Sequence, residues 1–171
     1  MRKFLYFLGA IAVFLLLFVS FKYLTVERID TSKLEYIENE DSVKLKRARQ
    51  NGKWALLDNE NRPITDFEYD YINTFVENRS EIMKNGKYGF IDDKANVIVE
   101  PKYDLVFDYS NGLAKVTLNG KWGVIDENGI ELISPNYYDY ISNFDYKGQA
   151  KAEVFKENKV VIIDKFGNIQ K

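Results

Sequence analysis

The stretch that decides the fold is NGKWGVID at residues 119–126, and the chain carries it in two earlier versions, NGKWALLD at 51–58 and NGKYGFID at 85–92. The three copies begin 34 residues apart, and a fourth apolar-aspartate pair, Ile163-Asp164, follows 38 residues after the third. A fixed period of this length is typical of repeat architectures, in which each unit covers the hydrophobic face of its neighbour. The chain is therefore expected to form a tandem array rather than one sheet over one core.

Each copy predicts a β-hairpin, because Asn-Gly between two strand-like runs supplies the two positive φ angles that a tight turn needs. In the third copy, residues 113–118 alternate apolar and polar side chains before the turn, and residues 121–126 form the return strand. An aspartate-led turn follows at 126–129, and a third short strand then runs to Pro135. A Tyr-Asp crossover leads to the next unit. An aromatic residue follows each crossover: Phe75, Phe107 and Phe144.

These signals predict an all-β fold of tandem three-stranded antiparallel repeats, each about 34 residues long and joined by the crossover. The two terminal fragments would together complete one further unit. Two arrangements remain open, an open stack of hairpins, which we favour, and a closed propeller-like ring sealed by the termini. The apolar run at 160–163 is expected to be buried on both faces. The predicted units are a half-repeat at 34–50, repeats at 51–84, 85–118 and 119–156, and a partial repeat at 157–171.

The amino-terminal end reads as a membrane anchor. Residues 4–21 are 18 consecutive uncharged positions, and thirteen of them are Phe, Leu, Ile or Val. A helix over them would be about 27 Å long, which matches the hydrocarbon thickness of a bilayer. We therefore expect one transmembrane helix within an anchor at 1–23, a short stalk at 24–33 and a repeat domain at 34–171.

The alternative for this segment is a cleaved signal peptide. The apolar run is longer than the hydrophobic region of such a peptide, and no small-x-small cleavage site follows it. Arg2 and Lys3 precede the span and Lys22 follows it. This charge difference favours a single-pass protein with a cytoplasmic amino terminus and an extracytoplasmic repeat domain.

Composition excludes several kinds of chemistry. The chain has no Cys and no His, so disulfide scaffolds, thiolate or imidazole zinc sites and Ser-His triads are excluded. Setting aside Arg2, Lys3 and Lys22 leaves 21 basic residues beyond the span against 26 acidic ones. An acidic domain is a poor partner for nucleic acid, which requires basic surfaces. We expect no nucleic acid, no metal and no cofactor.

The recurring aspartates are expected to be structural. One set follows each return strand and is predicted to cap turns, because catalysis needs one asymmetric pair rather than equivalent copies. A second set lies in the crossovers and is predicted to bond to the lysines of the Asn-Gly-Lys turns. We therefore expect no enzyme. The first set is Asp58, Asp92, Asp126 and Asp164; the second is Asp70, Asp104 and Asp139.

The pattern at 119–126, continued by Gly129, Pro135 and Tyr138, resembles the WG (KWG) repeat family. Residues 85–116 fit comparably, whereas 51–84 and 158–171 depart further from the family pattern. The resemblance covers roughly 120 residues, and the fixed repeat period is what makes it specific. It implies a bacterial β-repeat protein and carries over no catalytic residue. The structural signature is Asn51, Gly52, Trp54, Asp58, Asn85, Gly86, Tyr88, Asp92, Asn119, Gly120, Trp122 and Asp126.

The expected function is a membrane-anchored, non-catalytic interaction module. Repeats build extended surfaces, so the partner would be a protein or a cell-envelope polymer, with the bilayer contacted through residues 4–21. The alternative is an assembly component that self-associates through its repeat edges, and the sequence leaves the oligomeric state open. Trp54, Tyr88 and Trp122 are expected to be core residues. Tyrosines of the variable crossovers form the candidate binding surface, although packing under the crossover is their other reading: Tyr71, Tyr109, Tyr137, Tyr140 and Tyr146.

Overall fold

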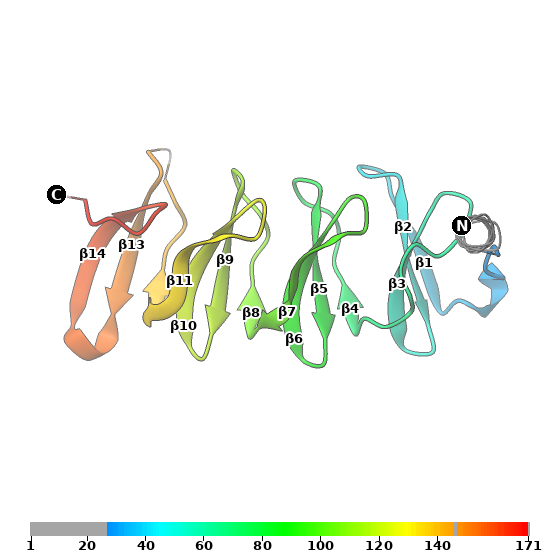
Figure 1. The fold of residues 1–171 in the computed structure, drawn as a ribbon, viewed down its shortest axis with the longest axis horizontal. Helices are drawn as coiled ribbons and strands as arrows, with labels where there is room; N and C mark the ends of the chain where they lie inside the picture. The colour runs from blue at the N-terminus through cyan, green and yellow to red at the C-terminus, as the bar shows by residue number, and fades with distance from the viewer. Residues whose placement is uncertain (1–26, 146, 171) are drawn as a thin grey trace, which may run out of the picture.

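The protein is a row of four antiparallel sheets. The computed structural model describes residues 27–145 and 147–170, and these contain strands β1 to β14 and two short 3-10 helices. Figure 1 shows the sheets side by side along the long axis, with the first sheet at one end and the last at the other. The open stack is therefore the observed arrangement, and the closed ring is not formed.

The two inner sheets share one four-stranded order. The second sheet consists of β4 (Tyr71–Ile72), β5 (Arg79–Lys84), β6 (Lys87–Asp92) and β7 (Val97–Tyr103). The third sheet consists of β8 (Leu105–Val106), β9 (Leu113–Leu118), β10 (Lys121–Asp126) and β11 (Glu131–Tyr138).

The two outer sheets have three strands each. The first follows η1 (Thr31–Lys33) and consists of β1 (Tyr36–Glu40), β2 (Leu45–Gln50) and β3 (Lys53–Leu57). The last consists of β12 (Tyr140–Ile141), β13 (Gln149–Val154) and β14 (Lys159–Asp164), with η2 (Phe155–Glu157) between β13 and β14.

The Asn-Gly turns adopt the predicted left-handed conformation. Asn119 has a φ of 51° and Gly120 a φ of 74°, and the two earlier Asn-Gly pairs have nearly the same angles. Positive φ at both positions matches the right-handed twist of the flanking strands. The last hairpin uses η2 instead, and its C-cap residue, Asn158, has a φ of 49°.

The inner sheets have one strand more than the sequence predicted. The residues just after the crossover aspartate, Leu105 and Val106, pair with Thr117 and Val116 of β9 in the following hairpin. The residues after the crossover aspartate therefore form the first strand of the next sheet. The strand that leads into the crossover belongs to the preceding sheet. A strand of two residues is too short to show an alternating sequence pattern. Its pairing partners lie in the following hairpin.

The glycine after the aromatic residue of the second and third signatures allows the strand that follows the return strand, β7 or β11, to approach closely. A Cβ on Gly123 would lie 2.5 Å from the carbonyl oxygen of Ile133, and one on Gly89 would lie 2.1 Å from that of Val99. The small residue therefore allows two strands of the same sheet to approach closely. The first sheet has Ala55 at this position, and the segment that follows its return strand β3 pairs through isolated bridges.

Three hydrophobic cores lie between the four sheets. Each return strand carries two adjacent apolar residues, and they point to opposite sides: Phe90 faces the third sheet, whereas Ile91 faces the first. We call the side of a sheet toward the next sheet its forward face. Val160 and Ile162 on the last forward face are 56% and 43% exposed, so the expectation that 160–163 is buried on both faces is wrong.

The predicted anchor at 1–23, with its span at 4–21, lies outside the described residues, as does the start of the predicted stalk at 24–33. Across residues 27–145 and 147–170, the structure contains no helix that is long and apolar enough to cross a membrane.

Candidate interaction surface

Exposed aromatic rings form clusters at two of the three junctions between sheets. At the first junction, the ring centroid of Trp54 lies 5.2 Å from Tyr36 and 6.3 Å from Tyr71, both edge-on. We call these three residues the first aromatic cluster. Tyr36 is 42% and Tyr71 37% exposed, so the cluster presents ring surface to solvent. Half-buried Trp54 also packs against the core below, which anchors the exposed rings.

The third junction repeats this arrangement. Trp122 stacks on Phe107 at 5.1 Å between ring centroids, and Tyr140 meets it edge-on at the same distance. We call Phe107, Trp122 and Tyr140 the second aromatic cluster. Phe107 and Tyr140 are each 37% exposed. Offset and edge-on pairs of this kind hold rings in fixed positions, which suits a preformed contact surface.

Each cluster is backed by a cation from an equivalent strand position. The guanidinium carbon of Arg47 lies 5.9 Å from the centre of the Trp54 ring, and Lys115 Nζ lies 5.3 Å from that of Trp122. Arg47 is buried and ion-paired with Glu40. A cation over an aromatic face is attracted by the negative charge of the ring face.

Both cations also reach across the junction to the next sheet. Arg47 Nη1 donates to the carbonyl oxygen of Ile72 at 3.0 Å, and Lys115 Nζ lies 3.5 Å from that of Ile141. Lys115 also donates to Asn143 Oδ1 at 2.5 Å. Desolvation lowers the pKa of the Lys115 ammonium, because burial disfavours its charged form.

The middle junction carries an acid at the same position. Glu81 pairs with Phe90 across the strands as Lys115 pairs with Val124. Burial, strengthened by the nearby negative charge of Asp108, raises the pKa of Glu81 to about 7. The ring pair at this junction, Phe90 and Tyr109 with centroids 4.8 Å apart, is buried, so the middle junction presents no exposed aromatic cluster among the described residues.

The predicted tyrosines fall into different environments. Tyr71 and Tyr140 are exposed members of the two clusters. Tyr137 is 41% exposed but lies apart, edge-on to Tyr138 with its hydroxyl near Glu157. Tyr146 lies outside the described residues.

Tyr109 is a core residue rather than a surface one. It is 3% exposed, and its hydroxyl donates to the carbonyl oxygen of Asp126 at 2.9 Å. It lies five residues after its crossover aspartate, as Phe75 and Phe144 do after theirs. In the middle crossover, Tyr109 therefore occupies the buried aromatic position, and Phe107 lies at the surface. Counting from the aspartate would have shown this in the sequence.

The sequence-based prediction of the binding surface did not include Tyr36, nor did it indicate that the tryptophans are partly exposed. Tyr36 precedes Ile37 on β1 as Tyr71 precedes Ile72 on β4, so the equivalence was present in the sequence. Trp54, Tyr88 and Trp122 pack against cores as expected, yet all three remain half-buried.

The recurring aspartates serve the scaffold, as predicted. Asp126 Oδ1 accepts the amides of Asn128 and Ile130 at 2.9 Å each, and the equivalent aspartates cap their turns in the same way. Asp139 accepts from Lys121 Nζ at 2.6 Å and from the amide of Phe155 at 2.8 Å, which joins two consecutive hairpins. The hydrogen bond from lysine lowers the pKa of these crossover carboxyls. Within the described residues, no group of three or more acidic side chains is placed to hold a metal ion.

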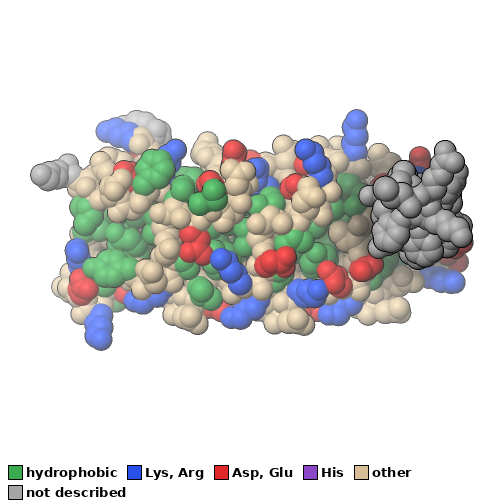
Figure 2. All heavy atoms as spheres, viewed as in Figure 1, with side chains coloured by type: hydrophobic (Ala, Val, Ile, Leu, Met, Phe, Trp, Pro, Cys, Tyr) green, Lys and Arg blue, Asp and Glu red, His purple; other side chains and the backbone are tan. Residues whose placement is uncertain are grey.

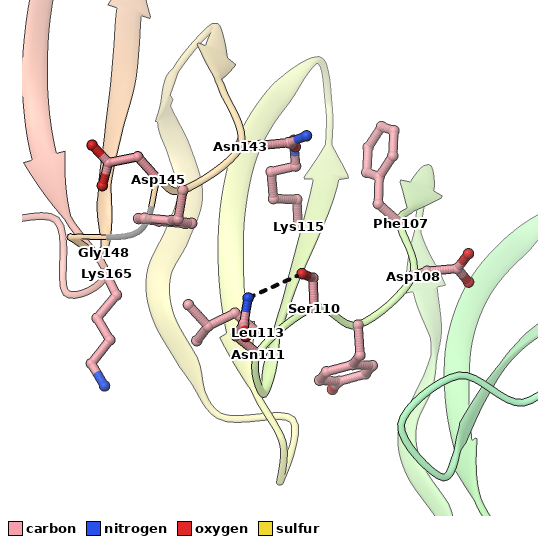
Figure 3. A pocket seen from close by; sticks show the side chains of 12 residues that line it. Phe107, Asp108, Ser110, Asn111, Leu113, Lys115, Asn143, Asp145, Gly148 and Lys165 are labelled. Atoms are coloured by element: carbon pink, nitrogen blue, oxygen red, sulfur yellow. Dashed lines mark hydrogen bonds between the residues drawn. The ribbon is translucent and has the colours of Figure 1, made fainter.

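An open groove of about 750 Å³ adjoins the second cluster (Figure 3). It lies between the loops that follow β8 and β12. Phe107, Lys115 and Asn143 line one part of it, and Asp145 and Lys165 line another. Figure 3 shows the Lys115 side chain reaching toward Asn143, with the Phe107 ring beside it. The groove thus combines ring, amide, carboxylate and ammonium groups, which suits a ligand with both apolar and hydrogen-bonding parts.

Comparison with known proteins gives one family. No curated protein matches the chain. Among solved structures, the WD40 domain of Neurospora crassa Pan2 is similar at 16% identity and a TM-score of 0.34, over 81% of this chain and 48% of that one. The chain therefore spans about half the length of that structure. The family described as WG containing repeat matches residues 54–88, 88–122 and 122–159 in tandem, more than half of the chain, and the protein belongs to this WG repeat family.

Proposed function

We propose that the protein is a non-catalytic interaction module that binds another protein through its two aromatic clusters. The observation that carries this proposal is the repeated pairing of exposed rings with a partly or fully buried cation, at the first and third junctions. Tyrosine and tryptophan are enriched where proteins bind one another, because they offer large contact areas at low entropic cost. The groove beside the second cluster extends the contact surface.

A single partner chain would have to span both clusters. The clusters lie at separate junctions of one row, so an extended segment running along the row would meet each in turn (Figure 1). Binding of this kind adds the contributions of several modest contacts. An envelope polymer with ring-stacking and hydrogen-bonding groups is the alternative ligand, and the experiment below distinguishes the two.

The proposal includes the membrane anchor at 1–23 and an extracytoplasmic domain. It rests on the 18 uncharged positions at 4–21 and on the basic residues before them. The chain has no Cys, so Glu127→Cys introduces a single reporter at a side chain that is 61% exposed. A membrane-impermeant maleimide is expected to label it in intact cells. Labelling that requires cell lysis would place the domain in the cytosol and contradict this part of the proposal.

Partner capture with matched variants tests the binding surface. The tagged full-length protein is cross-linked in cells, and co-purified proteins and polymers are quantified by mass spectrometry. Tyr71→Ser combined with Tyr140→Ser removes one exposed ring from each cluster and is expected to lower partner recovery about 10-fold. Tyr137→Ser removes an equally exposed tyrosine outside the clusters and serves as the control.

Three outcomes are informative in this experiment. Loss of a protein in the double variant, with recovery in the control, supports the proposal. Loss of a polymer with no change in proteins assigns the surface to the alternative ligand. Equal recovery from all three forms contradicts a role for the clusters.

A further inference from the structure

The forward face of the last sheet is built like the buried ones but is left uncovered. Ile162 on β14 occupies the position of Phe90 on β6 and Val124 on β10. Phe90 is 1% and Val124 0% exposed, whereas Ile162 is 43% exposed. Its neighbour Val160 is 56% exposed, at the position of the half-buried Trp122.

Other apolar side chains of the last sheet and its turns are exposed as well. Figure 2 shows hydrophobic side chains gathered at the end of the molecule that carries β14 in Figure 1. Within the described residues, the outer edge of β14 pairs with a single residue, Ile169, where β6 and β10 each pair with a full strand. Exposed apolar side chains gathered at one end of a molecule are typical of an interaction site. The additional exposed residues are Phe155 at 65%, Phe166 at 57% and Ile169 at 56%.

The same face carries two opposite charges. Lys151 pairs across the strands with Ile162, and Glu153 pairs with Val160. Lys151 Nζ lies 2.8 Å from Glu153 Oε1. At the first and third junctions, the residue at the position of Lys151 is the cation that contacts the next sheet. We call Lys151, Glu153, Val160 and Ile162 the terminal face.

At the other end of the row, the centre of the outward face is covered, although Ile37 on the edge strand β1 is 40% exposed. Ala48 and Leu57 hold the matching positions on the side of the first sheet that points away from the second, and both are 0% exposed. Packing of the terminal face on the first sheet of another copy would therefore require that end to be uncovered first. The described residues thus favour contact between like ends.

We propose that the terminal face packs on the terminal face of a second copy about a two-fold axis. In such an isologous contact, Lys151 of one copy meets Glu153 of the other, and the reverse contact forms by symmetry. Val160 and Ile162 of the two copies fill the space between the sheets, which pack about 10 Å apart in such layers. The terminal face is separate from the first aromatic cluster and does not depend on the partner bound there, whereas Tyr140 of the second cluster pairs with Glu153 and adjoins the terminal face.

Cysteine cross-linking of the full-length protein in its membranes tests this contact. Val160→Cys places one thiol on the terminal face of a chain that has no other cysteine. A short bifunctional maleimide is expected to give a covalent dimer in at least about 10-fold excess over Ile64→Cys, since the two thiols of an isologous dimer are close by symmetry. Ile64 is 45% exposed and lies beside the first sheet, so it is the matched control.

Two further variants separate interface loss from misfolding. Ile162→Glu in the Val160→Cys background puts one carboxylate from each copy in the contact and is expected to weaken association at least about 100-fold. Lys151→Glu is expected to lower the dimer yield, and adding Glu153→Lys is expected to restore it, because the reversed pair is again complementary. Because the second change also restores the pair within one chain, circular dichroism of each variant checks that the domain is folded.

The results decide the proposal in either direction. Dimer at position 160 that falls with Ile162→Glu and returns with the charge reversal supports it. Dimer no greater than in the Ile64→Cys control overturns it, as does cross-linking of Val160→Cys to a co-expressed Ile37→Cys chain, which would show head-to-tail packing on the outward face of the first sheet. Partner recovery through Tyr71 in the Ile162→Glu variant is expected to be unchanged, so failure here and failure of the proposed function are distinguishable.

Discussion

The third and middle junctions are built on the same backbone and carry opposite chemistry. At the third junction, Lys115 faces Asn143 and lies against two rings. At the middle junction, Glu81 faces Asp108, and burial raises its pKa to about 7. The cores beneath are equally closed, since Phe90 and Val124 are both buried. The scaffold therefore does not require either charge at this position, and the junctions differ in what they present to a partner.

The first junction has the most deeply buried cation, and its removal gives the largest predicted effect on stability. Arg47 is 6% and Glu40 7% exposed, and they form an ion pair. Arg47→Leu leaves a buried carboxylate without its cation and is expected to lower the free energy of unfolding by about 3–5 kcal/mol. Urea unfolding followed by circular dichroism measures this. Adding Glu40→Leu should recover most of the loss, and a double variant as unstable as the single one would refute the ion-pair explanation.

The strand that follows the return strand distinguishes the third sheet, which has β11 there, from the first sheet, which has isolated bridges. Gly123→Ala puts a Cβ 2.5 Å from the carbonyl oxygen of Ile133 and is expected to destabilise the protein by about 1–3 kcal/mol as β11 shifts. The first sheet accommodates Ala55 at this position because the segment after β3 pairs with it through isolated bridges. Thermal unfolding of Gly123→Ala beside Ala55→Gly checks the pair. An unchanged melting temperature for Gly123→Ala would mean that β11 does not need the close approach.

Glu81 makes the stability of the middle junction depend on pH. Its folded pKa is above its unfolded value, so the folded state holds the proton more tightly and the contribution of Glu81 is lost as pH rises through about 7. Glu81→Gln is expected to match the parent protein near pH 4 and to be about 1–2 kcal/mol more stable above pH 8, after allowance for solvent screening.

Chemical unfolding at several pH values tests this prediction, with Lys115→Gln as the control. The control replaces the equivalent residue of the third junction and lacks a carboxyl at that position. A difference between Glu81→Gln and the parent that stays constant from pH 4 to pH 8 would contradict a raised pKa.

Lys115 gives the smallest predicted effect on stability. Its side-chain partner, Asn143, is exposed and can turn to water when the ammonium is removed. Lys115→Met is therefore expected to lower the free energy of unfolding by at most about 1 kcal/mol. A loss as large as that of Arg47→Leu would show that the second cluster is as tightly coupled to the core as the first.

Local features of the fold were accessible from the sequence, and features that depend on neighbouring units were not. The Asn-Gly turns and the capping by Asp126 follow from the backbone preferences of a few consecutive residues. The strand at Leu105 and Val106 exists because β9 of the next hairpin pairs with it. Its length and position are set across the crossover, where the sequence has no period to reveal them.

The exposure of the crossover tyrosines was predicted in part. Tyr71 and Tyr140 were identified because tyrosines in variable segments are typical of contact surfaces, and both are exposed. Tyr109 looked the same in sequence but turns inward, since only its distance from the crossover aspartate sets its direction. The cations behind the clusters were not identified, because their distance from the rings depends on the packing of one sheet on the next.

Site-specific photo-cross-linking along the row tests the central claim most directly. A photoreactive phenylalanine analogue is placed in turn at Tyr71, Leu105 and Tyr140, the same position of three successive sheets. All three side chains are exposed, and the ring clusters flank the first and third positions. The account predicts that positions 71 and 140 capture the same partner and that position 105 captures it more weakly. Equal capture at all three positions, or capture at 105 alone, would contradict the assignment of binding to the aromatic clusters.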